Sequence, residues 1–109
     1  MKIFVDIDET ICRTPASHDY NDAQPMMDRI ERINRLYDQG HEIVYWTARG
    51  GTSGIDWSEV TKAQFDRWGV KCHDLRFKKP PYDLFIDDKN INSERFFETD
   101  AGLEAVPGS

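Results

Sequence analysis

The sequence has little of what cross-links or anchors a protein. Its two cysteines, Cys12 and Cys72, form no CxxC pair, and its three histidines have no metal-ligand spacing. A disulfide framework and a zinc site are therefore not expected, and both cysteines are predicted to be free thiols of a reducing, cytoplasmic compartment. No apolar run approaches the roughly 18 residues of a membrane span, so no membrane partner is expected.

Positive charge is also scarce. Fourteen Lys and Arg against 20 Asp and Glu give a net charge of −6, which argues against a general nucleic-acid binder. One stretch departs from this pattern, with five basic residues close together: Lys71, His73, Arg76, Lys78 and Lys79. Such a cluster either contacts phosphates or is a solvated face.

What the sequence does contain is an alternation of strand and helix patterns. Strands are expected over residues 2–7, 42–46, 70–72 and 82–86, and helices over residues 25–39, 57–68 and 93–97. Pro25 suits the first turn of the first helix, and Asp56 with Glu59 resembles a capping box for the second. The alternation predicts an α/β fold with a mainly parallel central sheet flanked by helices. The length of 109 residues predicts a single domain, residues 1–98, and a C-terminal tail, residues 99–109.

Acidic residues follow two of the expected strands directly. Asp6 and Asp8 end the first strand, Thr47 follows the second, and Asp87 and Asp88 follow the last. Because the carboxyl ends of parallel strands share one edge of a sheet, we expect these side chains to converge there. Four carboxylates in one cleft require a cation, and oxygen ligands favour Mg²⁺, which commonly binds together with a substrate phosphate.

Four segments, in order, resemble the motifs of the haloacid dehalogenase superfamily. KIFVDIDETI resembles the first motif, IVYWTAR the second and LFIDD the fourth, while the lysine of KKPPYD resembles that of the third. The resemblance covers residues 2–88. It implies a Rossmannoid fold of that superfamily and a phosphatase activity. The segments between the motifs are too short to form a cap domain, so an open active site is expected.

The resemblance also implies a role for each motif residue. Asp6 would be the nucleophile that forms an aspartyl-phosphate, and Asp8 the general acid and base. Thr47 and Lys79 would bind the phosphoryl group, with Lys78 as the alternative lysine. Mg²⁺ would be held by Asp6, by the Asp8 backbone carbonyl and by Asp87 or Asp88. Three further residues are candidates for substrate contact: Thr10, which alternatively fixes the turn, Arg49 and Lys78.

The expected function is Mg²⁺-dependent hydrolysis of a phosphomonoester, with a small sugar phosphate or related metabolite as the favoured substrate. The segment WTARGGTSGIDWSEVTKAQFDRWGV also resembles polynucleotide phosphatases, so a nucleotide or nucleic-acid substrate remains an alternative. A non-catalytic phosphate-binding regulator is a second alternative. An open site acting on a small metabolite would be shielded by a second copy of the chain, through residues 11–24 and 50–57.

Overall fold

The computed structural model describes residues 1–51, 53–99 and 103. The elements follow in the order β1 (Lys2–Val5), β2 (Cys12–Arg13), η1 (Tyr20–Asp22), β3 (Gln24–Pro25), α1 (Met27–Asp38), β4 (Glu42–Trp46), α2 (Ser58–Trp68), β5 (Asp74–Arg76) and α3 (Ser93–Phe97). Strands β2 and β3 form a short antiparallel pair. The expected C-terminal tail lies mostly outside the described residues.

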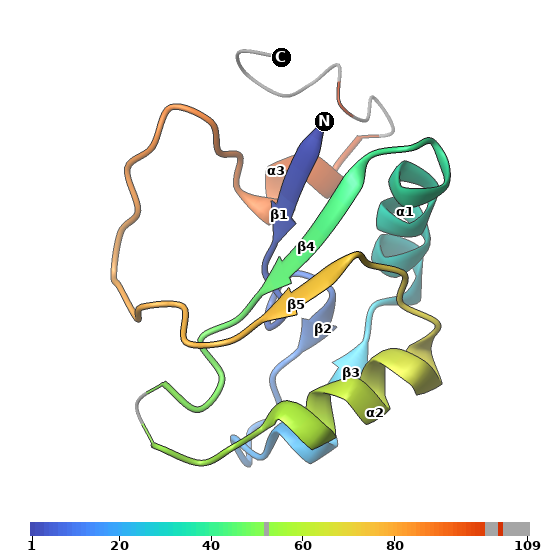
Figure 1. The fold of residues 1–109 in the computed structure, drawn as a ribbon. Helices are drawn as coiled ribbons and strands as arrows, with labels where there is room; N and C mark the ends of the chain where they lie inside the picture. The colour runs from blue at the N-terminus through green and yellow to red at the C-terminus, as the bar shows by residue number, and fades with distance from the viewer. Residues whose placement is uncertain (52, 100–102, 104–109) are drawn as a thin grey trace.

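Within the described residues, the central sheet has three parallel strands in the order β1–β4–β5 (Figure 1). From β1 to β4 to β5, each new strand is added on the same side of the one before it. Crossovers between parallel strands are right-handed. Both crossover helices, α1 and α2, therefore lie on the same face of the sheet. The structure confirms the predicted α/β architecture with a parallel sheet.

One face of the sheet carries the core. Val5, Ile43 and Tyr45 point to this face and are buried together with apolar side chains of all three helices, among them Ile30, Ile33, Phe65, Trp68 and Phe96. On the opposite face, Phe4 is 47% exposed and makes an edge-to-face contact with Trp46. The alternation of strand side chains places the core on the helical side.

The helices form where apolar residues recur at helical spacing, but their starts differ from the prediction. Helix α1 buries Ile30, Ile33 and Leu36 and begins at Met27, because Pro25 belongs to β3. At α2 the Asp56 carboxylate accepts from the Ser58 N–H, and Glu59 makes no capping-box contact among the described residues. Gly69, with φ of +70°, ends α2 in the left-handed conformation that glycine adopts without strain.

The later strand predictions are wrong in part. The strand expected over residues 70–72 lies instead at Asp74–Arg76. Residues 82–86 form an exposed loop, with Leu84 75% and Ile86 88% exposed, which projects away from the sheet (Figure 1). The preceding Pro80 and Pro81 lack backbone donors. A segment of strand-type composition forms a strand only where a neighbouring strand pairs with its backbone and other residues pack against its side chains.

Two other expectations concern the cysteines and the membrane. Cys12 and Cys72 are both free thiols, as predicted. Among the helices of the described residues, none combines the length and the apolarity that crossing a bilayer requires.

Tyr45 offers a test of core packing. Its hydroxyl is buried and has no hydrogen-bond partner among the described residues, and burial raises the pKa of this group far above its ordinary value. A buried polar group without a partner costs about 1–3 kcal/mol. Tyr45→Phe is therefore expected to raise the free energy of unfolding by about 1 kcal/mol, measured by urea denaturation. A loss of stability would mean that the hydroxyl has a partner.

Candidate functional site

The turn after β1 presents two carboxylates to the same side. Ile7 is fully buried, and its carbonyl accepts from the N–H groups of Thr10 and Ile11. Glu9 has φ of +61°, and its N–H donates to the Cys12 carbonyl, which turns the chain back on itself. Asp6 and Asp8 flank the buried Ile7 just after the carboxyl end of β1, and their side chains are 41% and 20% exposed.

Asp6 combines access to solvent with a cationic neighbour. Its side chain is 41% exposed, and the Lys79 ammonium lies 3.9 Å from Oδ1. Burial raises the pKa of Asp6, the Lys79 charge and the Ile7 N–H lower it, and the negative charge of Asp8 raises it. The balance is a raised pKa on an accessible carboxylate that faces a lysine.

Asp8 is held by a two-pronged ion pair. Arg49 Nη2 donates to Asp8 Oδ1 at 2.9 Å, and Arg49 Nε donates to Oδ2 at 3.0 Å. Both carboxylate oxygens are therefore fixed by one planar guanidinium, a geometry that lysine cannot reproduce. The pair sets the orientation of Asp8 relative to the end of β1.

The Arg49 guanidinium is enclosed by α2 and by the loop before α1. Its side chain is fully buried, and Nη1 donates to Thr61 Oγ1 at 3.0 Å and to Gln64 Oε1 at 2.6 Å. The Tyr20 ring covers it, with the guanidinium carbon 4.7 Å from the ring centroid. This placement is inconsistent with the predicted substrate contact, because the arginine is committed to Asp8 and to protein groups around it.

Cys12 is a neighbour of Asp8 that the sequence did not reveal. Its thiol is buried and donates to Asp8 Oδ1 at 3.5 Å. Burial, followed by the charge of Asp8, raises the pKa of Cys12 to about 12. The thiol therefore stays protonated at neutral pH and acts as a weak donor, not as a nucleophile.

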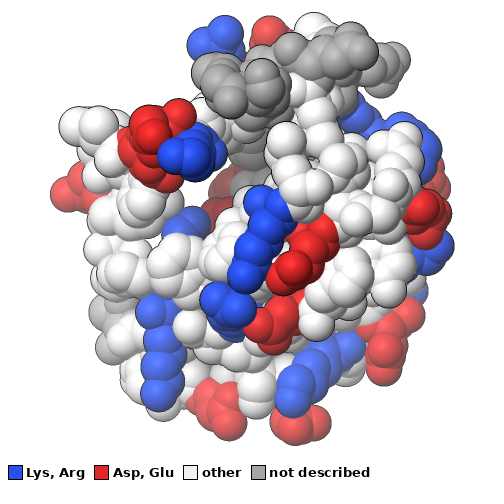
Figure 2. Space-filling view, turned by 45° about the horizontal axis from the view of Figure 1, so that its top comes forward, with Lys and Arg blue, Asp and Glu red and all other residues white. Residues whose placement is uncertain are grey.

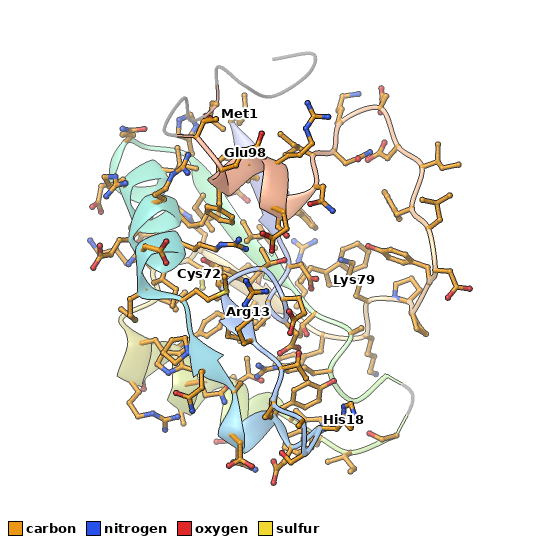
Figure 3. The ribbon with its side chains drawn as sticks, turned by 180° about the vertical axis from the view of Figure 1, so that it is seen from behind. Met1, Arg13, His18, Cys72, Lys79 and Glu98 are labelled. Carbon is orange, nitrogen blue, oxygen red and sulfur yellow. The ribbon has the colours of Figure 1, made fainter. Side chains whose placement is uncertain are left out.

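Thr47 and Lys79 meet at the carboxyl end of β4. Thr47 is buried, its hydroxyl accepts from the Arg49 N–H at 3.1 Å, and its carbonyl accepts from the Lys79 N–H at 3.0 Å. The Lys79 side chain, labelled in Figure 3, is 16% exposed, and its ammonium lies 3.9 Å from Asp6 Oδ1. Lys78, in contrast, is exposed and has φ of +65°. The geometry favours Lys79 over Lys78 as the lysine that faces Asp6.

The structure does not bring Asp87 and Asp88 to this site. Both are exposed on the projecting loop, where Asp88 pairs with Lys89 at 2.9 Å and Asn90 donates to the Asp87 carbonyl. The predicted strand that was to deliver them is absent from the described residues, so the predicted cluster of four acids is not assembled. Over the described ranges, no three His, Cys, Asp or Glu side chains gather in a way that could hold a metal ion.

Arg29 of α1 supports the turn and was also missed by the sequence. It is buried, donates to the Thr10 carbonyl at 3.2 Å and pairs with Glu94 of α3 at 2.9 Å. Thr10 thus occupies the turn and takes part in it through its backbone. No sequence signal distinguishes Arg29 or Arg49 from surface arginines, since each role depends on which helix the turn packs against.

Comparison with known proteins adds evidence on the fold. No family model matches the chain, and no curated protein matches it. A crystal structure of a target protein from Vibrio cholerae is similar over 92% of this chain and 89% of its own, with a TM-score of 0.79 and 28% sequence identity. This likeness supports a Rossmann-like α/β fold for the chain.

Proposed function

We propose that the chain is a phosphomonoester hydrolase of the haloacid dehalogenase type, with Asp6 as its nucleophile. The observation that carries the proposal is an accessible carboxylate beside a lysine, two residues before a second carboxylate that an arginine holds in place. A nucleophile must reach solvent, while an acid–base group must be oriented, and Asp6 and Asp8 differ in this way.

The chemistry consists of two displacements at phosphorus. An Asp6 oxygen attacks, the bond from phosphorus to the ester oxygen breaks, and the leaving oxygen takes a proton from Asp8 or from water. Water then attacks the aspartyl-phosphate, its proton passes to Asp8, and phosphate leaves with Asp6 restored. Lys79 lies close enough to offset part of the charge between Asp6 and the phosphoryl group.

The ion pair with Arg49 favours one of the two proton transfers proposed for Asp8, the one in which Asp8 accepts a proton. Both of its oxygens accept from the guanidinium, an arrangement that matches the ionised carboxylate. A carboxylate is ready to take a proton from water in the second displacement, but it has none to give in the first. The leaving oxygen of the first displacement would therefore take its proton from water.

Mg²⁺ remains the proposed cofactor, although the arrangement of the acids does not fit a complete site. Asp6 offers accessible oxygens, but Asp8 is engaged by Arg49, and Asp87 and Asp88 lie on the projecting loop. The residues in this arrangement supply too few ligands, and the steps above depend on protein groups alone. When bound, the cation would supply neutralisation of the phosphate charge.

The test is phosphate release from p-nitrophenyl phosphate with Mg²⁺ and after exhaustive chelation. Chelation is expected to lower the rate by about 10²-fold, because neutralisation of the phosphate charge by a cation contributes several kcal/mol. Without the cation, Lys79 alone would offset the repulsion between Asp6 and the phosphoryl group. Restoration by Mn²⁺ would be compatible with the proposal. Unchanged activity after chelation would remove Mg²⁺ from it, and absence of hydrolysis under every condition would remove the phosphatase itself.

A small substrate is favoured over a nucleic acid. In the basic stretch, Lys71 pairs with Asp38 at 2.9 Å and Arg76 pairs with Asp74 at 2.7 Å. The His73 ring accepts from the Ile43 N–H and stacks on Tyr37. On the face in Figure 2, basic and acidic side chains are interspersed. Cations already paired with carboxylates leave little net charge to follow a phosphate backbone.

A further inference from the structure

A small pocket is lined in part by the two neighbours of Arg49, the arginine that holds Asp8. It has a volume of about 230 Å³ and is formed where the loop between β2 and β3, which contains η1, meets the loop between β4 and α2. Tyr20 comes from the first loop, and Ile55 and Trp57 come from the second. The two segments, which the sequence analysis predicts to contact a second copy of the chain, form a concave surface of their own.

The pocket and the carboxylates share the same framework. Ala48 and Gly50, which line the pocket, stand on either side of Arg49, whose guanidinium holds Asp8. Tyr20 lines the pocket and covers that guanidinium. Burial raises the pKa of Tyr20, and the negative charge of Asp8 raises it further.

The shape of the pocket is built into the chain. The Tyr20 and Trp57 rings meet edge to face with centroids 5.0 Å apart, and Gln64 of α2 donates to the Tyr20 carbonyl. Gly50 has φ of +79°, and a Cβ there would overlap the Ile55 carbonyl, so a glycine is required for the two ends of this loop to approach. These contacts join the pocket to α2.

The residues that line the pocket favour an uncharged ring as the ligand. Its described residues combine aromatic and aliphatic surface with the polar side chains of His18 and Ser53, and include no Lys, Arg, Asp or Glu. The volume of about 230 Å³ is below the roughly 300–1,000 Å³ of sites for drug-sized ligands. The pocket therefore suits one ring. The perpendicular Tyr20 and Trp57 rings cannot sandwich a flat base, whereas one aromatic face and two polar side chains suit a ring that carries hydroxyls.

We infer that this pocket binds the sugar ring of a monosaccharide phosphate and holds it as the leaving group of the reaction. The inference rests on the proposed function and specifies its substrate. With the ring in the pocket, the phosphoryl group would extend toward Asp6 and Lys79, and the ester oxygen would lie on the side of Asp8. In Figure 3, His18 at the lower edge and Lys79 above it both lie in the right half of the view.

The test compares a hexose phosphate with ethyl phosphate, which has the same phosphoryl group and no ring. Trp57→Ala is expected to lower kcat/KM for the hexose phosphate about tenfold, within the range for loss of one aromatic stacking partner. Most of this change should appear in KM. The rate with ethyl phosphate should stay within about twofold, and Trp57→Phe should restore most of the loss because it keeps an aromatic face.

A second variant protects the test from a folding defect in Trp57→Ala. Ile55 is 54% exposed, so Ile55→Trp should fold normally and fill the pocket, with the same selective loss. If both variants treat the two substrates alike, the sugar pocket is refuted while the phosphatase stands. A Trp57-dependent preference for a nucleoside monophosphate would refute the sugar assignment.

If the native chain hydrolyses nothing, the proposed function fails, and calorimetry tests the pocket separately. Hexose phosphate should then still bind more tightly than ethyl phosphate to the native chain, and this preference should vanish in Ile55→Trp. Equal affinity of the native chain for both compounds, or no binding of either, would overturn the inference.

Discussion

Replacing Asp6 by Asn is expected to reduce the release of phosphate to the background rate. An amide cannot displace the leaving group, and loss of a catalytic nucleophile costs roughly 10⁴–10⁶ in kcat in well-studied hydrolases. Because burial already disfavours the charge on Asp6 by raising its pKa, the uncharged Asn should leave the fold intact. The measurement is p-nitrophenyl phosphate hydrolysis together with thermal unfolding.

The matched control is Asp66→Asn, which removes an exposed carboxylate from α2 and should change neither quantity. Trapping with hydroxylamine adds a chemical readout, because an acyl phosphate on Asp6 reacts to give a hydroxamate that the Asp6→Asn protein cannot form. An Asp6→Asn protein that retains activity would refute the assignment of the nucleophile.

The fold could be predicted where a local pattern determines the structure. Residues 43–46, IVYW, are a continuous apolar run, and β4 occupies the predicted residues Glu42–Trp46. The pattern SERFF gives α3 at Ser93–Phe97, where Asn92 caps the first turn. YDLFI, residues 82–86, has the same strand-type composition as β4 but pairs with no strand of the described residues. A strand needs a partner supplied by the rest of the chain, and composition does not report it.

The candidate site divides in a similar way. The sequence predicted that Asp6, Asp8, Thr47, Asp87 and Asp88 would meet at one edge of the sheet, and the resemblance added Lys79. The structure brings Asp6, Asp8, Thr47 and Lys79 to the ends of β1 and β4, but not Asp87 and Asp88. Their catalytic roles remain predictions. The environment of Asp8 could not be predicted, because it depends on α2, whose Thr61 and Gln64 hold the Arg49 guanidinium that bonds to Asp8. A motif specifies which residues are present, and tertiary packing decides which of them are restrained.

The second large effect concerns Arg49, whose positive charge is fully buried and bonded to Asp8, Thr61 and Gln64. Removing one partner of a buried ion pair typically costs about 3–5 kcal/mol. The side chain of Asp8 is 20% exposed, so water can solvate its carboxylate in part once Arg49 is removed. The loss of stability should therefore lie at the lower end of this range. Arg49→Met is therefore expected to lower the free energy of unfolding by about 3 kcal/mol, and Tm by roughly 10 °C or more.

The control is Arg76→Met, since Arg76 pairs with Asp74 at the surface, and such pairs contribute at most about 1 kcal/mol. A similar small loss for Arg49→Met would show that its contacts do not stabilise the fold.

Arg49→Lys separates stability from positioning. It keeps the positive charge but cannot hold both oxygens of Asp8 together with Thr61 and Gln64. If the pair orients Asp8 for proton transfer, this variant should lose kcat by roughly 10²-fold, the scale of a misplaced catalytic group, while KM changes little. In an Asp8→Asn background the same replacement should have almost no effect on kcat, because the group that it positions is already gone. Equal losses of kcat in both backgrounds would mean that Arg49 acts independently of Asp8, and its part in the proposed reaction would then be structural alone.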